Sequence, residues 1–415
     1  MKTLIQHASQ IVTFKGQSAK HGKQMQEMHV IEDGCILIED DVIVFVGRTS
    51  DRPVIDPDTK IIDATGKLVT PGWIDPHTHL VFGSDRVQEF YQRLQNQSYQ
   101  SILKKGGGIH QSIEKTTNTS LSELFDQADR YIKKMICMGV TTVEAKSGYS
   151  RDFEGEIKQM EVIRQLNQKW DDMIVPTCMA AHVIPLEHQK DPSVYIDMIT
   201  ERLIPYVKRH HLAVFFDAFL EENAYAADQI KTILTNAKQA GFGIKLHCDE
   251  IHDLDGAALA ASLGCISAEH LLMSNQKGLQ AMADANVIAT FLPLTAFSLK
   301  KPYAKARTMI DMGLSVTLAT DFNPGSCFSY DILMLMALAV MQMDMTIEET
   351  LCAFTLNGAA SLMLADKTGT LEPGKKADIV IHDCPSYVHL IYHMGINQVE
   401  QVIKNGKTVY HHKER

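Results

Sequence analysis

The chain has 415 residues, which is more than one ordinary hydrophobic core needs but fits a (β/α)8 barrel of about 250 residues with a smaller second domain. Hydrophobic residues make up 45% and charged residues 22%, as in ordinary globular proteins rather than disordered or membrane-embedded ones. The formal net charge of -10 argues against a nucleic-acid or anionic-membrane partner, because either requires a basic surface, so we expect a small-molecule ligand.

Both ends of the chain have the pattern of short β-strands. Near the amino terminus, strands over 35–38 and 42–46 flank a turn at Asp40 and Asp41, which predicts a hairpin. Near the carboxyl terminus, further strands are predicted over 378–382, 399–403 and 408–410. Neither end has enough apolar residues for a core of its own, so we expect residues 1–65 and 366–415 to pair into one composite β-sandwich domain.

The middle of the chain, residues 66–365, alternates short apolar runs with longer stretches of helical periodicity. This pattern predicts βα units around a parallel sheet, and thus an α/β protein built on a (β/α)8 barrel. The expected barrel strands cover 68–75, 141–145, 174–181, 213–219, 243–247, 265–270, 287–292 and 315–321. Barrel enzymes carry their catalytic groups at the carboxyl ends of the strands, so polar residues at these ends are the candidates for function.

Nothing in the sequence predicts export or membrane insertion. Residues 3–7 interrupt any apolar signal segment, and the longest apolar run, 332–341, is half of the ~20 residues that a membrane span needs. The eight cysteines are scattered without a CxxC pair, which is typical of reduced, buried thiols. We therefore expect a cytoplasmic protein.

Histidine and aspartate side chains gather at the predicted strand ends. His77 and His79 follow the first strand, and residues two apart on an extended segment point to the same side. Such a pair alone is more often coincidental, but His247 closes the fifth strand, His270 the sixth and Asp321 the eighth. Three imidazoles and one carboxylate suit Zn²⁺ or Fe²⁺ and leave room for a bound water, so we predict a metal site.

These segments resemble signatures of the amidohydrolase superfamily, and the resemblance covers essentially the whole chain. The matching segments are 71–79, with its Pro-Gly-x-Ile-Asp-x-His-Thr-His pattern, Thr320-Asp321, and 369–378. Some members hold two metal ions bridged by a carbamylated lysine at the end of strand four, and here 213–219 contains no lysine. The resemblance therefore implies one divalent or trivalent ion per chain, zinc or iron.

Four further segments, 106–109, 144–149, 247–250 and 320–326, are similar to one family of cyclic amidases within that superfamily. Members of this family hydrolyse 4-imidazolone-5-propanoate to N-formimidoyl-L-glutamate, the third step of histidine degradation, and the resemblance implies a homodimer. Carried over residue by residue, the family pattern implies metal ligands at His77, His79, His247 and Asp321. It implies substrate contacts at Arg86, Tyr149, His182, Glu250, Asn323, Gly325 and Ser326.

The implied contacts suit a small anionic lactam. The Arg86 guanidinium matches a propionate carboxylate, although without the resemblance it reads as a solvated surface arginine. Glu250, three residues after His247, could exchange a proton with a ring nitrogen. Residues 323–326 precede an expected helix, so their backbone N–H groups could hold an oxyanion, although Asn-Pro-Gly is also simply a good turn.

The mechanism that we expect is hydrolysis by a metal-activated water. Asp321 would take the proton of that water, and His270 would steady Asp321 or relay charge. His182 would polarise the ring carbonyl, although a hydrogen-bonded core histidine is a rival interpretation. Glu250 or Asp321 would return a proton to the leaving nitrogen. Asp321, Glu250, His270 and His182 are thus the predicted catalytic residues.

Two alternative functions and three features stay open. A deaminase of the same superfamily is one alternative, because the His-x-x-Glu pair at His247 and Glu250 also occurs in such enzymes, and ammonia release would reveal it. The other is a non-catalytic scaffold, which metal analysis would reveal. Lys146, Asp249 and the 106–108 glycine loop have no assigned role.

Overall fold

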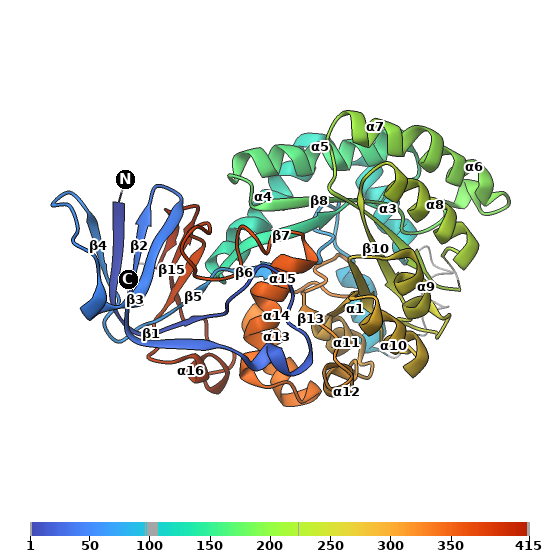
Figure 1. The fold of residues 1–415 in the computed structure, drawn as a ribbon. Coiled ribbons are helices and arrows are strands. Elements are labelled where there is room, and N and C mark those ends of the chain that lie inside the picture. The colour runs from blue at the N-terminus through green and yellow to red at the C-terminus, as the bar shows by residue number, and fades with distance from the viewer. Residues whose placement is uncertain (1, 96, 98–106, 223, 413–415) are drawn as a thin grey trace.

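Two β-structures dominate the computed structural model, which describes residues 2–95, 97, 107–222 and 224–412. An eight-stranded mixed sheet gathers strands from both ends of the chain, and a parallel eight-stranded sheet carries the middle of the chain. Figure 1 shows the mixed sheet on the left, with the blue and red ends of the chain side by side, and the helix-covered parallel sheet on the right.

The parallel sheet is the predicted barrel. Consecutive strands pair in parallel along the order β13-β12-β11-β10-β9-β8-β7-β6. A parallel bridge between Thr78 and Phe322 closes the barrel just after its first and last strands. The strands are β6 (Trp73–Asp75), β7 (Val140–Lys146), β8 (Ile174–Ala181), β9 (Phe215–Leu220), β10 (Gly243–Cys248), β11 (Ser267–His270), β12 (Ile288–Phe291) and β13 (Val316–Leu318).

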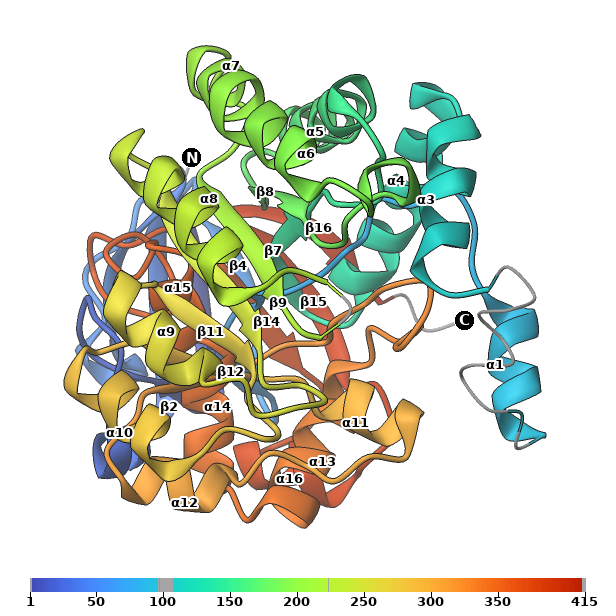
Figure 2. The same ribbon diagram turned by 90° about the vertical axis from the view of Figure 1, so that its right-hand side faces the viewer.

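Helices surround the barrel, and Figure 2 shows them around the strands, with α1 at the edge. The helices are α1 (Val87–Leu94), α3 (Ile109–Asn118), α4 (Leu121–Cys137), α5 (Phe153–Lys169), α6 (Pro192–Asp197), α7 (Ile204–Arg209), α8 (Ala227–Gln239), α9 (Gly256–Leu263), α10 (Gln276–Asp284), α11 (Pro293–Leu299), α12 (Ala306–Asp311), α13 (Ile332–Met343), α14 (Ile347–Phe354), α15 (Leu356–Ser361) and α16 (Tyr387–Tyr392). Short helical turns cover η1 (Gly22–Gln26), η2 (Thr49–Asp51), η3 (Leu186–His188) and η4 (Met198–Leu203).

Helix α4 illustrates why these segments are helical. The Ser120 hydroxyl accepts a hydrogen bond from the Glu123 backbone N–H at 3.3 Å, and the Glu123 carboxylate accepts one from the Ser120 N–H at 3.0 Å. This capping box satisfies two backbone groups that the first helical turn leaves unpaired. Leu124, Ala128 and Ile132 recur every four residues, and the apolar face that they form is buried.

The mixed sheet draws its strands from both ends of the chain, as the sequence predicted. The predicted hairpin is β2 paired with β3, with Glu39 opposite Val42. Strands β5 and β14 pair antiparallel, with Thr70 opposite Val380, and thereby join the two ends of the chain. The strands form one hydrogen-bonded sheet, comprising β1 (Lys2–Thr13), β2 (His29–Glu39), β3 (Val42–Arg48), β4 (Lys60–Asp63), β5 (Leu68–Pro71), β14 (Ile379–His382), β15 (Val399–Lys404) and β16 (Lys407–His411).

The strand expected over 68–75 is divided between the two sheets. Its first part, β5, belongs to the mixed sheet, and its second part, β6, is the first barrel strand. Gly72 lies between them and donates its N–H to the Asp378 carbonyl at 2.9 Å. A Cβ at Gly72 would lie 2.1 Å from Thr141 Oγ1, so only glycine lets the chain pass this close to β7.

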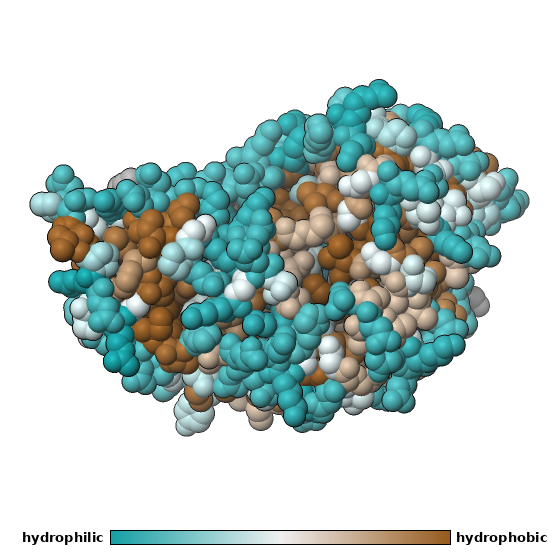
Figure 3. Space-filling view, in the orientation of Figure 1, coloured by the Kyte–Doolittle hydropathy of each residue, from teal (hydrophilic) through white to brown (hydrophobic). Residues whose placement is uncertain are grey.

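In the face drawn in Figure 3, hydrophobic residues are visible both over the barrel and over the mixed sheet. Exposed apolar side chains of the mixed sheet include Val30, Val44 and Ile61. Within the described part of the chain, no helix combines the length and apolarity that a membrane crossing requires. The cysteines are free thiols, and seven of the eight are buried, as their spacing predicted.

Candidate active site

Three histidines converge at the carboxyl end of the barrel. His77 and His79 follow β6 directly, and His247 lies near the end of β10. All three are buried, and one nitrogen of each lies within 4.8 Å of the others. The Nε2 atoms of His79 and His247 are 3.4 Å apart. The structure therefore brings together three side chains that the sequence separates by up to 170 residues.

Asp321 completes the predicted ligand set. It follows β13, and its backbone N–H donates to the His77 carbonyl at 3.0 Å, where the barrel closes. Its Oδ1 atom is 3.5 Å from His77 Nε2 and 3.7 Å from His79 Nε2. Its other oxygen accepts a hydrogen bond from the Thr295 hydroxyl at 2.6 Å. One carboxylate oxygen thus faces the histidines while Thr295 fixes the other.

The donor atoms fit a single metal ion. His77 Nε2 is buried and has no hydrogen-bond partner in the described part of the chain. The opposite nitrogens of two histidines face carboxylates, with His77 Nδ1 2.8 Å from Glu269 and His247 Nδ1 3.1 Å from Asp217. The hydrogen bond to Glu269 holds the N–H of His77 on Nδ1, so the Nε2 lone pair of His77 remains available to an ion. Asp217 lies at the corresponding nitrogen of His247.

The protonation state of the histidines also suits metal binding. Burial lowers the pKa of His77 and of His79 well below the ordinary value, and neighbouring cationic groups lower it further. Burial likewise lowers the pKa of His247 to about 4, although Asp217 opposes the shift. The imidazoles are therefore neutral near pH 7, which is the form that binds metal ions.

One cavity gathers the histidines with nearly all of the predicted substrate residues. Its lining comprises His79, Arg86, Ile109, Tyr149, His182, Phe219, His247, Glu250, His270, Asp321, Asn323 and Ser326. Gly325, the remaining predicted contact, lies directly against Arg86. The cavity thus combines the cationic Arg86 and the apolar Ile109 and Phe219 with three of the metal-ligand candidates, His79, His247 and Asp321.

Arg86 is held at this cavity rather than in bulk solvent. It precedes α1, its backbone N–H donates to the Pro324 carbonyl at 3.1 Å, and its side chain is only 13% exposed. A Cβ on Gly325 would lie 1.2 Å from Arg86 Nη2, so the guanidinium fills the space that a side chain there would need. The Glu89 carboxylate is 3.7 Å from Nη1, and Nε has no partner in the described chain.

Glu89 also anchors the glycine-rich segment. Its carboxylate accepts a hydrogen bond from the Gly108 N–H at 2.9 Å. Gly108 has a φ of 85°, a conformation that favours glycine, and it precedes α3. Gly106 lies outside the described residues. The Glu89 carboxylate, which lies in α1, thus ties α1 to the start of α3 through Gly108.

His182 and Tyr149 form an aromatic wall beside His79. The His182 ring stacks on His79 with centroids 4.9 Å apart, and the Tyr149 ring lies 5.5 Å from His182. Burial lowers the pKa of His182 to about 3 and raises that of Tyr149. Both groups are therefore uncharged near pH 7 and can donate a hydrogen bond to a ligand. His182 Nδ1 has no partner in the described chain, so it is not a hydrogen-bonded core histidine.

The Asn323 segment differs from the expectation that its backbone N–H groups hold an oxyanion. The Gly325 and Ser326 N–H groups both donate to Asn323 Oδ1 at 2.8 Å. The next helix, α13, begins only at Ile332, so no helix N-terminus faces the cavity here. The expected oxyanion role of these amides is therefore wrong, because the asparagine side chain already occupies them. The side chains of Asn323 and Ser326 still line the cavity.

Glu250 and His270 face one another across the cavity. His270 Nε2 is 3.8 Å from a Glu250 oxygen. Asp249, for which the sequence assigned no role, fixes this loop: its carboxylate accepts from the Gly256 and Ala257 N–H groups, both at 3.0 Å, and from Ser274 Oγ at 2.6 Å. Asp249 thus caps α9 and leaves Glu250 free to face the cavity.

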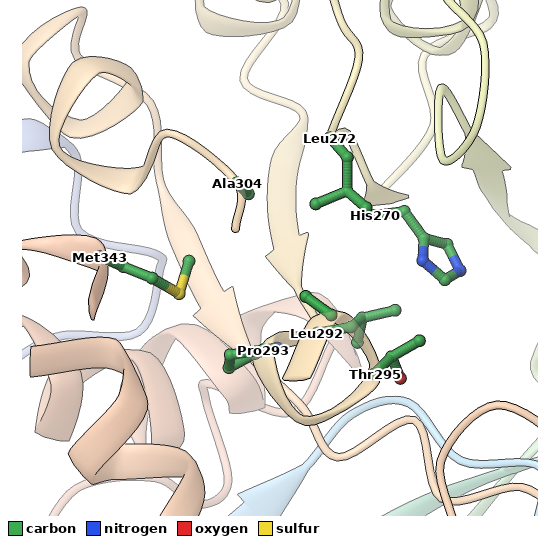
Figure 4. A pocket seen from close by; sticks show the side chains of 8 residues that line it. His270, Leu272, Leu292, Pro293, Thr295, Ala304 and Met343 are labelled. Carbon is green, nitrogen blue, oxygen red and sulfur yellow. The ribbon is translucent and has the colours of Figure 1, made fainter. Parts of the chain in front are cut away.

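A second, smaller pocket lies behind His270 and is mainly apolar (Figure 4). Its lining comprises His270, Leu272, Leu292, Pro293, Thr295, Ala296, Ala304 and Met343. Thr295, which holds Asp321, thus stands at the edge of an apolar wall. Burial of Asp321 raises the pKa of its carboxyl to about 6, although His270 and Thr295 oppose the shift.

Sequence reasoning missed three side chains that contact the metal-ligand candidates, namely Asp217, Glu269 and Thr295. Asp217 and Glu269 lie inside barrel strands, where apolar residues are the rule. A charged residue within such a strand is the signal that could have revealed them, because a buried charge must have a partner close by. Thr295 lies in α11, and no local pattern announces its contact with a residue 26 positions away.

Known proteins resemble this chain over nearly its whole length. The amidohydrolase family profile matches residues 68–409. The imidazolonepropionase of Porphyromonas gingivalis is 45% identical over 413 residues, covering 99% of this chain and 98% of that protein. The imidazolonepropionase of Clostridium tetani is 46% identical over 409 residues, covering 98% of both chains.

Solved structures share the fold at low identity. A triazine hydrolase variant superposes with a TM-score of 0.77 at 17% identity, covering 99% of this chain and 95% of that one. E. coli guanine deaminase superposes with a TM-score of 0.74 at 15% identity over 100% of both chains. At such identities the likeness concerns the fold, whereas the sequence relatives match from end to end, and the chain therefore belongs to the amidohydrolase family and, within it, to the imidazolonepropionases.

Proposed function

We propose that this protein hydrolyses 4-imidazolone-5-propanoate to N-formimidoyl-L-glutamate. The observation that carries the proposal is one cavity that Arg86 lines together with His79, His247 and Asp321 of the metal-ligand candidates. A substrate that carries both a carboxylate and a cyclic amide matches a cavity that offers both a guanidinium and a set of metal-ligand candidates. The full-length relatives are imidazolonepropionases, which supports the same reaction.

His77, His79, His247 and Asp321 are the residues that would hold one zinc or iron ion. Such an ion supplies Lewis-acid activation of water and of the amide carbonyl. Thr295 fixes the orientation of Asp321, and Glu269 fixes that of His77. The three neutral imidazoles and one carboxylate leave the ion a net positive charge, which favours attack on an amide.

The other residues bind the substrate and move protons. The Arg86 guanidinium binds the propionate carboxylate, and Ile109 and Phe219 contribute an apolar part of the cavity lining. Tyr149 and the neutral His182 donate hydrogen bonds to the ring and its carbonyl oxygen. Asp321 takes a proton from the attacking water, the amide C–N bond breaks, and Asp321 or Glu250 returns a proton to the leaving nitrogen. His270 steadies Asp321 or relays charge, and the side chains of Asn323 and Ser326 contact the substrate.

We expect one metal ion per chain. The strand-four position that carries a bridging lysine in binuclear relatives lies in β9, which contains no lysine. The nearby Lys146 ammonium is 2.7 Å from Asp217 and 2.8 Å from Glu144, so its amine is not free to form a carbamate. Elemental analysis of the purified protein should give a metal-to-chain ratio near one, and two tightly held ions would contradict the mononuclear site.

Gly325→Ala should weaken substrate binding without removing the metal. The added methyl group would overlap the Arg86 guanidinium, whose Nη2 lies 1.2 Å from the Cβ position, and would displace it. We expect KM to rise about tenfold or more, since the carboxylate loses part of its charged partner. Steady-state kinetics with metal content measured alongside test this, and an unchanged KM would show that Arg86 does not bind substrate. Gly374→Ala, which meets no atom within 4 Å, controls for the strain of substituting a glycine.

The proposed reaction is tested by incubating the purified protein with 4-imidazolone-5-propanoate and following the loss of substrate absorbance. A sample stripped of metal is the control, and activity should return when zinc or iron is added back. Equal rates with and without metal would contradict the proposal. We further propose that the protein is a homodimer, as its resemblance to the family implies.

A further inference from the structure

A group of five charged side chains is buried next to the histidine cluster. Two of them, Asp217 and Glu269, contact histidines, and the proposed reaction gives the other three no role. The five are Glu144 and Lys146 on β7, Asp217 on β9, Lys245 on β10 and Glu269 on β11, and each is at most 1% exposed. Burying an ionised group is costly unless it is paired and hydrogen-bonded. The question is therefore what such a group contributes to this end of the barrel.

The contacts link four of these groups into one row. Lys146 Nζ is 2.7 Å from Asp217 Oδ2 and 2.8 Å from Glu144 Oε2. Lys245 Nζ is 3.1 Å from the other Glu144 oxygen. Positive and negative groups thus alternate from Lys245 through Glu144 and Lys146 to Asp217. The two acidic neighbours of Lys146 outweigh the effect of burial and raise the pKa of its ammonium, so Lys146 is charged.

The row ends on a metal-ligand candidate. The Asp217 oxygen that contacts Lys146 is also the oxygen that lies 3.1 Å from His247 Nδ1. On the far side of its ring, His247 Nε2 faces His79. One oxygen atom is therefore shared between the Lys146 ammonium and the imidazole. Movement of that oxygen would change both the ring orientation of His247 and the direction of its Nε2 lone pair.

We propose that Lys146 is a positioning residue of the metal centre, because it holds Asp217 where that carboxylate orients His247. Glu144 holds the Lys146 ammonium from its other side, and Lys245 in turn pairs with Glu144. Lys146 acts through Asp217 and does not itself line the described cavity. The inference rests on the ligand set proposed above and adds a residue to it that touches neither the ion nor the substrate.

A purely structural role for Lys146 makes a different prediction. If Lys146 only neutralises buried carboxylates, its loss lowers the stability of the barrel but leaves the metal affinity of the folded protein unchanged. If Lys146 positions His247, its loss weakens metal binding and alters the ligand geometry. Metal affinity and the spectrum of a bound ion separate these roles, and neither readout depends on turnover.

The test uses full-length Lys146→Met and Asp217→Asn. Metal-stripped proteins are titrated with Zn²⁺ against a chromophoric chelator, and the d–d absorption of bound Co²⁺ reports ligand geometry. Each variant should bind Zn²⁺ about 10- to 100-fold more weakly and show a shifted Co²⁺ spectrum, as is usual when a group that orients a ligand is removed. The double variant should bind Zn²⁺ no more weakly than the weaker-binding of the two single variants, because both changes break the same contact between Lys146 and Asp217. Lys146→Arg keeps the charge and should restore much of the affinity.

Lys404→Met is the matched control. Lys404 Nζ lies 3.0 Å from Asp378 in a buried lysine–aspartate pair of the mixed sheet, away from the histidines. Its loss should cost stability while Zn²⁺ affinity and the Co²⁺ spectrum stay at parent values. A weakened metal affinity in this control would mean that general destabilisation explains the effect, and the proposal would fail.

Parent-like Zn²⁺ affinity and Co²⁺ spectra in Lys146→Met and Asp217→Asn would overturn the proposal. If Lys146→Met does not fold, Asp217→Asn and Lys146→Arg decide it: parent-like binding in the first would overturn it, and weak binding in the first with near-parent binding in the second would support it. His247→Ala separates this result from the ligand set itself, because a parent-like affinity in that variant would overturn the ligand set and the inference together.

Discussion

Replacing His247 by alanine is expected to remove both the metal and the activity while leaving the protein folded. The side chain supplies one of three nitrogens that lie within 4.8 Å of one another, and the other two imidazoles cannot replace it. The loss also leaves Asp217 without one of its partners, which should cost about 1–3 kcal/mol of unfolding free energy. This is less than the ~5–15 kcal/mol that stabilises a typical domain.

Metal content, circular dichroism and turnover of His247→Ala check this prediction together. His412→Ala is a suitable control, since His412 is exposed and follows β16 of the mixed sheet. The control should keep its metal and its activity. A His247→Ala protein that turned over substrate at the parent rate would remove His247 from the ligand set.

Arg86→Ala should lose substrate affinity without losing the metal. If the guanidinium binds the propionate carboxylate, its removal leaves that charge unpaired and should cost ~2–4 kcal/mol. This corresponds to a decrease of about 30- to 1000-fold in kcat/KM. Folding should change little, because the ion pair that Arg86 makes within the described part of the chain is a long one, 3.7 Å to Glu89. Steady-state kinetics with metal analysis measure both effects.

Arg86→Lys distinguishes charge from geometry at the same position. Lysine keeps the positive charge but lacks the planar pair of donors that matches a carboxylate, so it should restore only part of the activity. If both variants matched the parent, the carboxylate contact would have to be abandoned, and the case for this substrate over an uncharged heterocycle would weaken.

The barrel and its histidines could be predicted because their signals are local. Short apolar runs separated by helical stretches indicate βα units whatever packs around them. Once the eight strands are placed, topology alone brings their carboxyl ends together, so His77, His247 and Asp321 were expected to meet. The structure brings these residues together as that argument requires.

Other features depend on contacts that local patterns do not encode. Gly72 divides one apolar run between two sheets because Thr141 lies close to it, and nothing in 68–75 announces that contact. The side-chain oxygen of Asn323 accepts hydrogen bonds from the N–H groups of Gly325 and Ser326, whereas the sequence indicates only a turn at this place. The solvated interpretation of Arg86 failed for the same reason, since its location depends on Gly325, 239 positions away.

Product identity tests the assignment of this chain most directly. The protein, loaded with metal and incubated with 4-imidazolone-5-propanoate, is analysed by NMR for products and by an enzymatic assay for free ammonia. Ring opening should yield N-formimidoyl-L-glutamate in proportion to the substrate consumed, with no ammonia released. Failure to open this ring, together with ammonia release when the same protein is given an aminated heterocycle such as guanine or cytosine, would contradict this and assign the chain to deamination instead.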